Sequence, residues 1–171
     1  MEPVEIDAGA YRLRRFRADH RLDDRQALVE AFTDPVQQRF VPGYIVDTLH
    51  AASAYVELRE SEWDSGKRCS WAVAERPDGP LLGEIGLKEL DLDAGTAEVA
   101  LWVHPAARGR GIAAAAVEAA LRFGFGTLGL REVDYLHDPG NHASASVARR
   151  CGFVRTGTDE AGETRWTRRA S

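Results

Sequence analysis

The most regular alternation of apolar and polar positions lies at residues 96–103, where Thr-Ala-Glu-Val-Ala-Leu-Trp-Val predicts a strand. Because successive side chains of a strand point to opposite faces, Glu98 and Trp102 share one face of this strand. Apolar runs at 69–75 and 81–90 precede it, each followed by a short turn that contains Asp and Gly. Short turns join antiparallel neighbours, so the pattern predicts a three-stranded meander.

Apolar residues at helical spacing account for much of the remaining chain. They predict a first helix between an N-cap at Asp19 and the pair Asp34-Pro35, and further helices at 47–63, 111–127 and 141–151. Additional strands are expected at 11–17, 132–137, 153–158 and 163–168, and a loop at 39–44. The strand at 132–137 follows a helix, so it should lie parallel to the strand at 96–103.

These elements predict one α/β (α+β) domain over residues 1–171. Its sheet is expected to be mixed and mostly antiparallel, with about seven strands flanked by about four helices.

A run of two arginines and two glycines separates the strand at 96–103 from an alanine-rich helix: Arg108, Gly109, Arg110 and Gly111, here called the glycine loop. The first N–H groups of a helix lack partners within it, and the helix dipole favours negative charge there. Glycine also lets the backbone approach a ligand closely. The arrangement therefore predicts a phosphate cradle. Ala114 stands where a dinucleotide motif needs glycine, and the chain has no Gly-Lys-Ser/Thr tripeptide.

A second informative segment runs from Asn141 to Phe153 and reads Asn-His-Ala-Ser-Ala-Ser-Val-Ala-Arg-Arg-Cys-Gly-Phe. Asn141 is suited to cap a helix by accepting a hydrogen bond from a first-turn N–H. Gly152 fits the position just past a helix end, where the left-handed conformation favours glycine. The segment predicts a short crossover helix packed against the sheet.

Together the two segments resemble the signatures of GNAT N-acetyltransferases. Arg108, Gly111 and Ala113 correspond to the pattern Arg/Gln-x-x-Gly-x-Gly/Ala. The segment from Asn141 is similar to the Asn-x-x-Ser-x-x-Val-x-x-x-x-Gly-Phe ending of the RimJ/RimL branch of ribosomal-protein alanine acetyltransferases. The resemblance covers residues 11–166 and implies the GNAT fold. It also implies acetyl-CoA as cosubstrate and transfer of the acetyl group to a primary amine. No metal is expected, because the histidines lack a His-Glu-x-x-His arrangement and no carboxylate or thiolate cluster accompanies His137 and His142.

The resemblance implies a path for acetyl-CoA, with its pyrophosphate on the glycine loop amides and its pantetheine beside the central strand. The expected binding residues are Leu101, Trp102, Val103, Arg108, Gly109, Arg110, Gly111, Ile112, Ala113, Asn141 and Arg149. Either Arg149 or Arg150 would meet the 3′-phosphate, unless both are simply exposed residues at a helix end. Family members carry a bulge in this strand, and a bulge here would separate it from its neighbour.

Glu98 is the candidate general base. A carboxylate beside Trp102 on a central strand is partly desolvated, which raises its pKa and suits a base. GNAT enzymes often carry a strand glutamate at this position. A salt bridge to Lys88 or Arg131 would make Glu98 structural instead. Glu84 is the second candidate and is expected on an exposed face.

Ser144 is the candidate proton donor to the CoA thiolate. Many GNAT enzymes use a tyrosine of the last helix, and this chain has no tyrosine after Tyr135. The structural alternative for Ser144 is a hydrogen bond to the local backbone. Acetyl transfer is expected by direct attack of the amine in a ternary complex, without an acetylated enzyme.

The acceptor is the least defined part of the site. It is an amine on a protein N-terminus or a small molecule, bound by the first two helices and the loop between them. Phe40, Tyr44 and Trp63 either line that side or belong to the core. A non-catalytic module that binds acyl-CoA fits the same glycine loop, although Glu98 and Ser144 favour catalysis.

Composition narrows the class of protein. The 171 residues are 44% hydrophobic and 29% charged, with a net charge of −5, which argues against a nucleic-acid partner. No apolar run approaches 18 residues and no signal pattern opens the chain, so no membrane partner and a cytoplasmic location are expected. Cys69 and Cys151 have no zinc-like spacing and are expected to be buried thiols. Relatives in the family are often dimeric, so a homodimer is one expected assembly.

Overall fold

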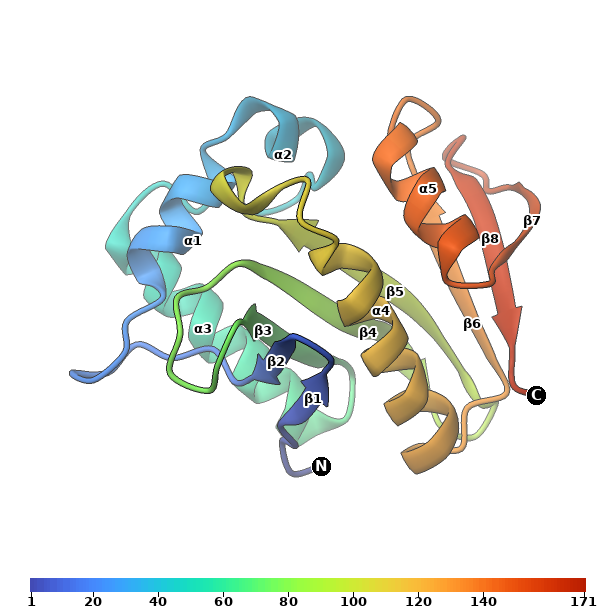
Figure 1. Cartoon of the computed structure of the whole chain (residues 1–171), viewed down its shortest axis with the longest axis horizontal. Coiled ribbons are helices and arrows are strands. Elements are labelled where there is room, and N and C mark those ends of the chain that lie inside the picture. The colour runs from blue at the N-terminus through green and yellow to red at the C-terminus, as the bar shows by residue number, and fades with distance from the viewer.

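The computed structural model describes residues 1–171 and is built around one eight-stranded sheet in the order β1-β2-β3-β4-β5-β6-β8-β7 (Figure 1). The strands are β1 (Ile6–Ala8), β2 (Tyr11–Arg14), β3 (Cys69–Ala74), β4 (Gly83–Asp91), β5 (Thr96–Val103), β6 (Glu132–His137), β7 (Val154–Thr158) and β8 (Thr164–Arg169). The helices are α1 (Arg25–Phe32), α2 (Pro35–Phe40), α3 (Leu49–Ser65), α4 (Ile112–Arg122) and α5 (His142–Arg150). A π-helical turn, Phe123–Thr127, continues α4. None of the helices is long and apolar enough to cross a bilayer.

The predicted mixed, mostly antiparallel sheet is confirmed. β3, β4 and β5 form the antiparallel meander, and β6 lies parallel to β5. Every other strand pair is antiparallel. The sheet has eight strands rather than about seven because β1 precedes the expected first strand, and α2 adds a fifth helix.

The N-terminal helices differ most from the sequence prediction. Asp19 does not cap a helix; its carboxylate accepts hydrogen bonds from the N–H groups of Arg21 and Leu22 and so forms a turn. Pro35 does not simply follow a helix but begins α2, because proline is tolerated in the first turn. Asp34 caps α2 by accepting from Gln37 N at 3.0 Å. The loop predicted at 39–44 therefore begins only after α2 ends.

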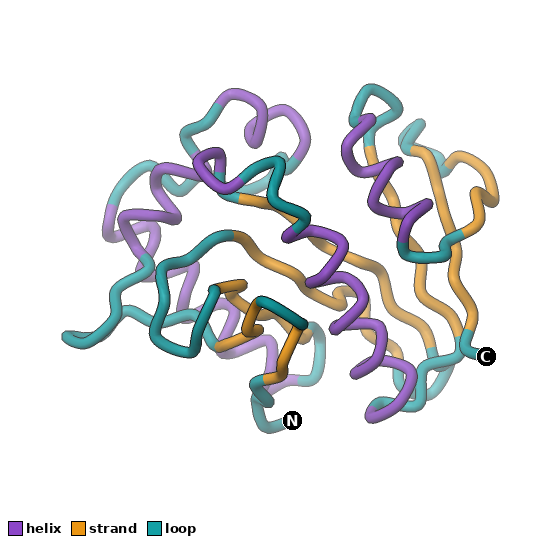
Figure 2. The backbone as a smooth tube through the Cα atoms, viewed as in Figure 1, coloured by secondary structure: helices purple, strands orange, loops and turns teal.

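Helices lie on both sides of the sheet (Figure 2) and enclose two apolar cores. The larger core lies on the side of α4 and α5 and includes Trp71, Ile85, Leu87, Val99 and Val117. The smaller core lies on the side of α1 and α3 and includes Leu28, Phe32, Tyr55, Leu81 and Trp102. Alternate residues of β3 and β5 reach opposite cores, as strand geometry requires.

Glu84 of β4 is buried, with only 1% of its surface exposed, so the prediction that it lies on an exposed face is wrong. Four side chains donate to its carboxylate: Tyr55 Oη, Trp102 Nε1 at 2.7 Å, Arg59 Nε at 2.6 Å and Arg68 Nη2 at 3.2 Å. Burial alone would raise the pKa of Glu84, but the charges of Arg59 and Arg68 outweigh it and the pKa is lowered. The carboxylate thus joins α3, β4 and β5.

We expect Glu84→Gln to destabilise the fold by about 3–5 kcal/mol, because two buried arginines lose their counter-charge. Urea unfolding at pH 7 measures this. The folded-state pKa of Glu84 lies below its unfolded value of about 4.3. Its stabilising contribution is therefore complete above that unfolded value and is lost as the pH falls through the folded one. The difference between wild type and Glu84→Gln should shrink accordingly in acid.

Glu60→Gln is the matched control, since Glu60 pairs with Arg15 at the surface with 56% of its side chain exposed. Such a pair contributes about 0–1 kcal/mol. Equal losses for the two variants would show that the buried carboxylate does not hold α3 on the sheet.

Candidate functional site

β5 and β6 pair only at their first residues, Thr96–Glu98 beside Glu132–Asp134. Beyond Glu98, β5 stays in register with β4 up to Val103, while β6 stays paired with β8 along its whole length. The two ribbons therefore diverge, as Figure 1 shows. The register shift between β4 and β5 lies between Lys88 and Asp91, opposite Ala97, and none accompanies residues 101–103. The extra residue belongs to β4, so the bulge expected in β5 is absent. The strands separate because each follows its other partner.

A cavity of about 560 Å³ opens beside the part of β5 that β6 leaves unpaired, although β6 itself contributes no residue to its wall. This β5–β6 cavity has four walls: Leu101–Val103 of β5, residues 107–114 around the glycine loop, the start of α5, and α2. The wall from α2 consists of Val36, Gln37 and Phe40, followed by Val41. The structure thus brings together the two segments that the sequence marked separately.

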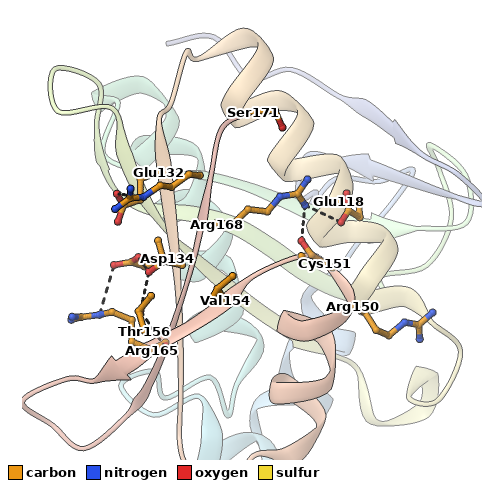
Figure 3. Close-up of a pocket in the computed structure, with 13 residues that line it drawn as sticks. Glu118, Glu132, Asp134, Arg150, Cys151, Val154, Thr156, Arg165, Arg168 and Ser171 are labelled. Atoms are coloured by element: carbon orange, nitrogen blue, oxygen red, sulfur yellow. Dashed lines mark hydrogen bonds and ion pairs between the residues drawn. The ribbon is translucent and has the colours of Figure 1, made fainter.

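A larger depression of about 870 Å³, the β7 groove, runs along the far edge of the sheet (Figure 3). Three of its four arginines already pair with carboxylates: Arg168 with Glu118 at 3.1 Å, Arg169 with Glu132 at 3.6 Å and Arg165 with Asp134 at 3.7 Å. The fourth, Arg150, lines the groove and the β5–β6 cavity alike. Binding sites for small ligands are typically apolar hollows with a few converging polar groups. The β5–β6 cavity has this character and the β7 groove does not, so the cavity is the candidate site.

The glycine loop has the backbone that its residues favour. Gly109 and Gly111 have φ values of +79° and +74°, in the left-handed region, and Gly111 is the N-cap residue of α4. At both positions no other atom lies within 4 Å of where a Cβ would stand. The N-terminus of α4 is therefore open on the side of the cavity, as a phosphate cradle requires.

The two arginines of the glycine loop are held by carboxylates from elsewhere in the chain. Arg108 Nη2 donates to Asp34 Oδ2 at 2.9 Å, and Arg110 pairs with Glu75. Tyr11 Oη donates to the carbonyl of Arg110 at 3.2 Å. Burial opposes ionisation of Asp34, but the bond and charge of Arg108, together with the backbone N–H groups of Val36 and Gln37, outweigh it and lower the pKa of Asp34. The loop is thus tied to α2 and to the sheet.

The start of α5 confirms the predicted cap, since Asn141 Oδ1 accepts from Ser144 N at 3.1 Å. Gly152, just past the helix, has the predicted left-handed φ of +77°. Ser144 lines the cavity, and its Oγ accepts from Tyr135 Oη at 3.2 Å. Burial raises the pKa of Tyr135 to about 12, so this hydroxyl stays a donor at neutral pH. The proton of Ser144 Oγ therefore remains available to a ligand.

The contact of Tyr135 with Ser144 was not predicted, because the tyrosine of many GNAT enzymes lies on the last helix and Tyr135 lies on β6. The signal lies in the alternation of β6, where Val133, Tyr135 and His137 are buried and their neighbours are only partly buried. That pattern turns Tyr135 toward α5.

Two predicted site residues do not line the cavity. Glu98 is half-buried where β5 and β6 part, with Lys88 and Asp134 as its register neighbours. Burial raises its pKa, against the opposing charge of Lys88. Arg149 lies with its guanidinium 5.5 Å from the Trp166 ring, whereas Arg150 lines the cavity. Successive residues point about 100° apart on a helix, so the two arginines face different directions.

The three aromatic residues considered for the acceptor side have different surroundings. Phe40 lines the cavity. Trp63 packs edge-on against Trp71, with 5.2 Å between the ring centroids, and belongs to the larger core. Tyr44 packs against Tyr55 at 5.4 Å beside the smaller core.

Both cysteines are free and buried. Burial raises the pKa of Cys69 to about 12 and that of Cys151 to about 11. Neither sulfur belongs to the cavity wall. A thiol becomes nucleophilic when its pKa is lowered, so these environments suppress thiolate chemistry.

Comparison with known proteins gives a family match. Residues 12–154 match the family described as "Acetyltransferase (GNAT) domain". Over 80 residues the chain is 35% identical to a Bacillus subtilis (strain 168) protein provisionally named a ribosomal N-acetyltransferase, YdaF. That segment covers 47% of this chain and 44% of the Bacillus protein, so the match spans less than half of that relative's length.

Solved structures share the fold over nearly the whole chain. RimL, a ribosomal L7/L12 alpha-N-protein acetyltransferase in complex with coenzyme A, has a TM-score of 0.82 and 18% identity, covering 97% of this chain and 98% of that one. Mycobacterium smegmatis RimJ in complex with CoA-disulfide has a TM-score of 0.79 and 18% identity, covering 98% and 88%. At these identities the likeness establishes the fold, and the fold expected from the resemblance is confirmed.

Proposed function

This chain is an acetyltransferase of the GNAT family, and we propose that it transfers the acetyl group of acetyl-CoA to the α-amine of a protein N-terminus. The observation that carries the proposal is the β5–β6 cavity, whose walls include both family signatures, the glycine loop and the start of α5. RimL and RimJ, which share this fold, are structures with CoA or its disulfide bound. RimL is named as an acetyltransferase of a ribosomal protein, L7/L12, and this supports a protein acceptor here.

The cavity walls fit the successive parts of acetyl-CoA. N–H groups from Gly109 to Ala113 would hold the pyrophosphate at the start of α4. The edge of β5 at 101–103, which has no strand partner on the β6 side, would bind the pantetheine amides. Asn141 would donate to a pantetheine carbonyl through its side-chain NH₂, because its Oδ1 is used by the helix cap. Arg150 replaces Arg149 as the candidate for the 3′-phosphate.

The proposed chemistry is direct attack of the acceptor nitrogen on the thioester carbonyl. The C–N bond forms, the C–S bond breaks, and the amine loses a proton. Glu98 would take that proton through water, since it is not part of the cavity wall. Ser144, held by Tyr135, would donate a hydrogen bond to the departing thiolate. Holding both substrates in one cavity supplies proximity, which lowers the barrier of such reactions by about 7–11 kcal/mol.

Gly111→Asp should weaken acetyl-CoA binding at least tenfold, because a carboxylate at the start of α4 repels the pyrophosphate. Titration calorimetry measures the affinity. Gly129→Asp is the matched control: Gly129 also has a left-handed φ of +68° and no atom within 4 Å of where a Cβ would stand, but it lies outside the cavity. Equal affinities for the two folded variants would remove the pyrophosphate from this loop.

Glu98→Gln should lower kcat about 10²-fold while acetyl-CoA affinity stays unchanged, because the amide cannot accept the amine proton. Burial raises the pKa of Glu98, so the wild-type rate should climb with pH through a value above about 4.3. The pH–rate profile of Glu98→Gln should lack this rise. Glu132→Gln, at a half-buried carboxylate of β6, should keep the wild-type profile. A wild-type rate and profile for Glu98→Gln would make Glu98 structural.

Direct attack also predicts that acetyl-CoA alone leaves the protein unmodified. The raised pKa values of both cysteines support this expectation. Intact-mass measurement should show no acetyl adduct, and initial-rate lines with acetyl-CoA and a peptide panel should intersect. A stoichiometric adduct that a peptide then discharges would contradict the proposal, with Cys151 the first residue to suspect. Tight acetyl-CoA binding without acetylation of any amine would favour an acyl-CoA-binding module.

A further inference from the structure

The side-chain amide of Gln37, on α2, is buried beside the cavity, and its NH₂ group has no hydrogen-bond partner. Only 3% of its surface is exposed, it belongs to the cavity wall, and its Nε2 has no hydrogen-bond partner in the protein. The other buried side-chain atoms without partners are Nε atoms of Arg12, Arg14 and Arg165, whose guanidinium groups all form ion pairs. Gln37 has no such compensation, and an unpaired buried donor opposes folding.

The helix that carries Gln37 is fixed in place. Asp34 accepts from the N–H of Gln37 at 3.0 Å and from Arg108 Nη2 at 2.9 Å. One carboxylate therefore holds both the backbone of Gln37 and the glycine loop. The backbone of Gln37 is consequently held at a defined position, and its side chain forms part of the cavity wall.

Gln37 lies on α2, an element from which the proposed function takes no group for acetyl-CoA. Those groups come from β5, the glycine loop and α5, whereas α2 contributes only Val36, Gln37 and Phe40 to the wall. The space beside α2 is therefore left for the second substrate. The Nε2 group is a neutral donor, which suits a carbonyl oxygen.

We propose that Gln37 is an acceptor-binding residue whose Nε2 donates a hydrogen bond to the first backbone carbonyl of the acceptor peptide. The inference rests on the proposed function. That carbonyl is three bonds from the reacting α-amine, so the contact orients the amine toward the thioester. A lysine side chain carries no carbonyl near its ε-amine. Gln37 thus selects peptide α-amines over lysine side chains.

Two serine-initiated peptides test the contact, one natural and one with its first peptide bond replaced by a trans-alkene. Wild type should prefer the natural peptide about tenfold in kcat/KM. Gln37→Met, which keeps the length and removes the donor, should lose about tenfold on the natural peptide and little on the alkene. A tenfold change corresponds to about 1.4 kcal/mol, within the range of one buried hydrogen bond. Gln38→Met, on the exposed side of α2, is the matched control.

Stability and binding separate this role from a structural one. Removal of an unpartnered amide should leave Tm unchanged or raised and should leave acetyl-CoA affinity unchanged. The side-chain NH₂ resonances of Gln37, identified by their absence in Gln37→Met, should shift when the natural peptide joins the CoA complex. CoA alone should not shift them.

The inference would be overturned by equal losses on both peptides, by a lowered Tm for Gln37→Met, or by weakened acetyl-CoA binding. A wild-type enzyme that acetylates both peptides equally well would overturn it while keeping the proposed function. Acetyl-CoA binding without acetylation of either peptide, with lysine side chains acetylated instead, would overturn the choice of α-amines as well.

Discussion

The limited pairing of β5 with β6 is the constraint on which the molecule depends. Three residues of each strand pair in parallel, after which β5 continues with β4 and β6 with β8. An open sheet edge in the middle of a fold is costly unless a ligand or side chains cover it. Here α4 and α5 flank the opening and direct their N-termini to it, so the same divergence creates the cavity and supplies its polar groups.

The wall opposite α5 is kept rigid by a buried charge. Glu84 accepts hydrogen bonds from α3 and from the Trp102 indole, and Trp102 is also a wall of the cavity. A buried, fully paired carboxylate adds little net stability compared with apolar packing, but its hydrogen bonds are directional and constrain where its partners lie. The network therefore sets the position of the cavity wall more than it strengthens the fold.

Local signals in the sequence predicted β5, β6 and α5, because alternation, an N-cap and a terminal glycine are all carried by neighbouring residues. Asp34-Pro35 was ambiguous, since proline both ends one helix and begins the next. The sequence could not tell which of Arg149 and Arg150 points to the cavity, because successive residues of a helix point about 100° apart and the rotation of α5 is set by packing. Glu84, Tyr135 and Gln37 depend on partners, or on the absence of partners, that are set by tertiary packing alone.

The double role of Asp34 has a thermodynamic consequence. The carboxylate caps α2 and neutralises Arg108, so any anion that draws Arg108 away alters the electrostatic environment of the first turn of α2. If an anion bound at Arg108 changes the binding free energy of a second ligand beside α2, the second ligand changes the binding free energy of the anion by the same amount, because such linkage is reciprocal. Under the proposed function, the affinities for the two substrates would thereby be coupled through the exchange of one guanidinium between two anions.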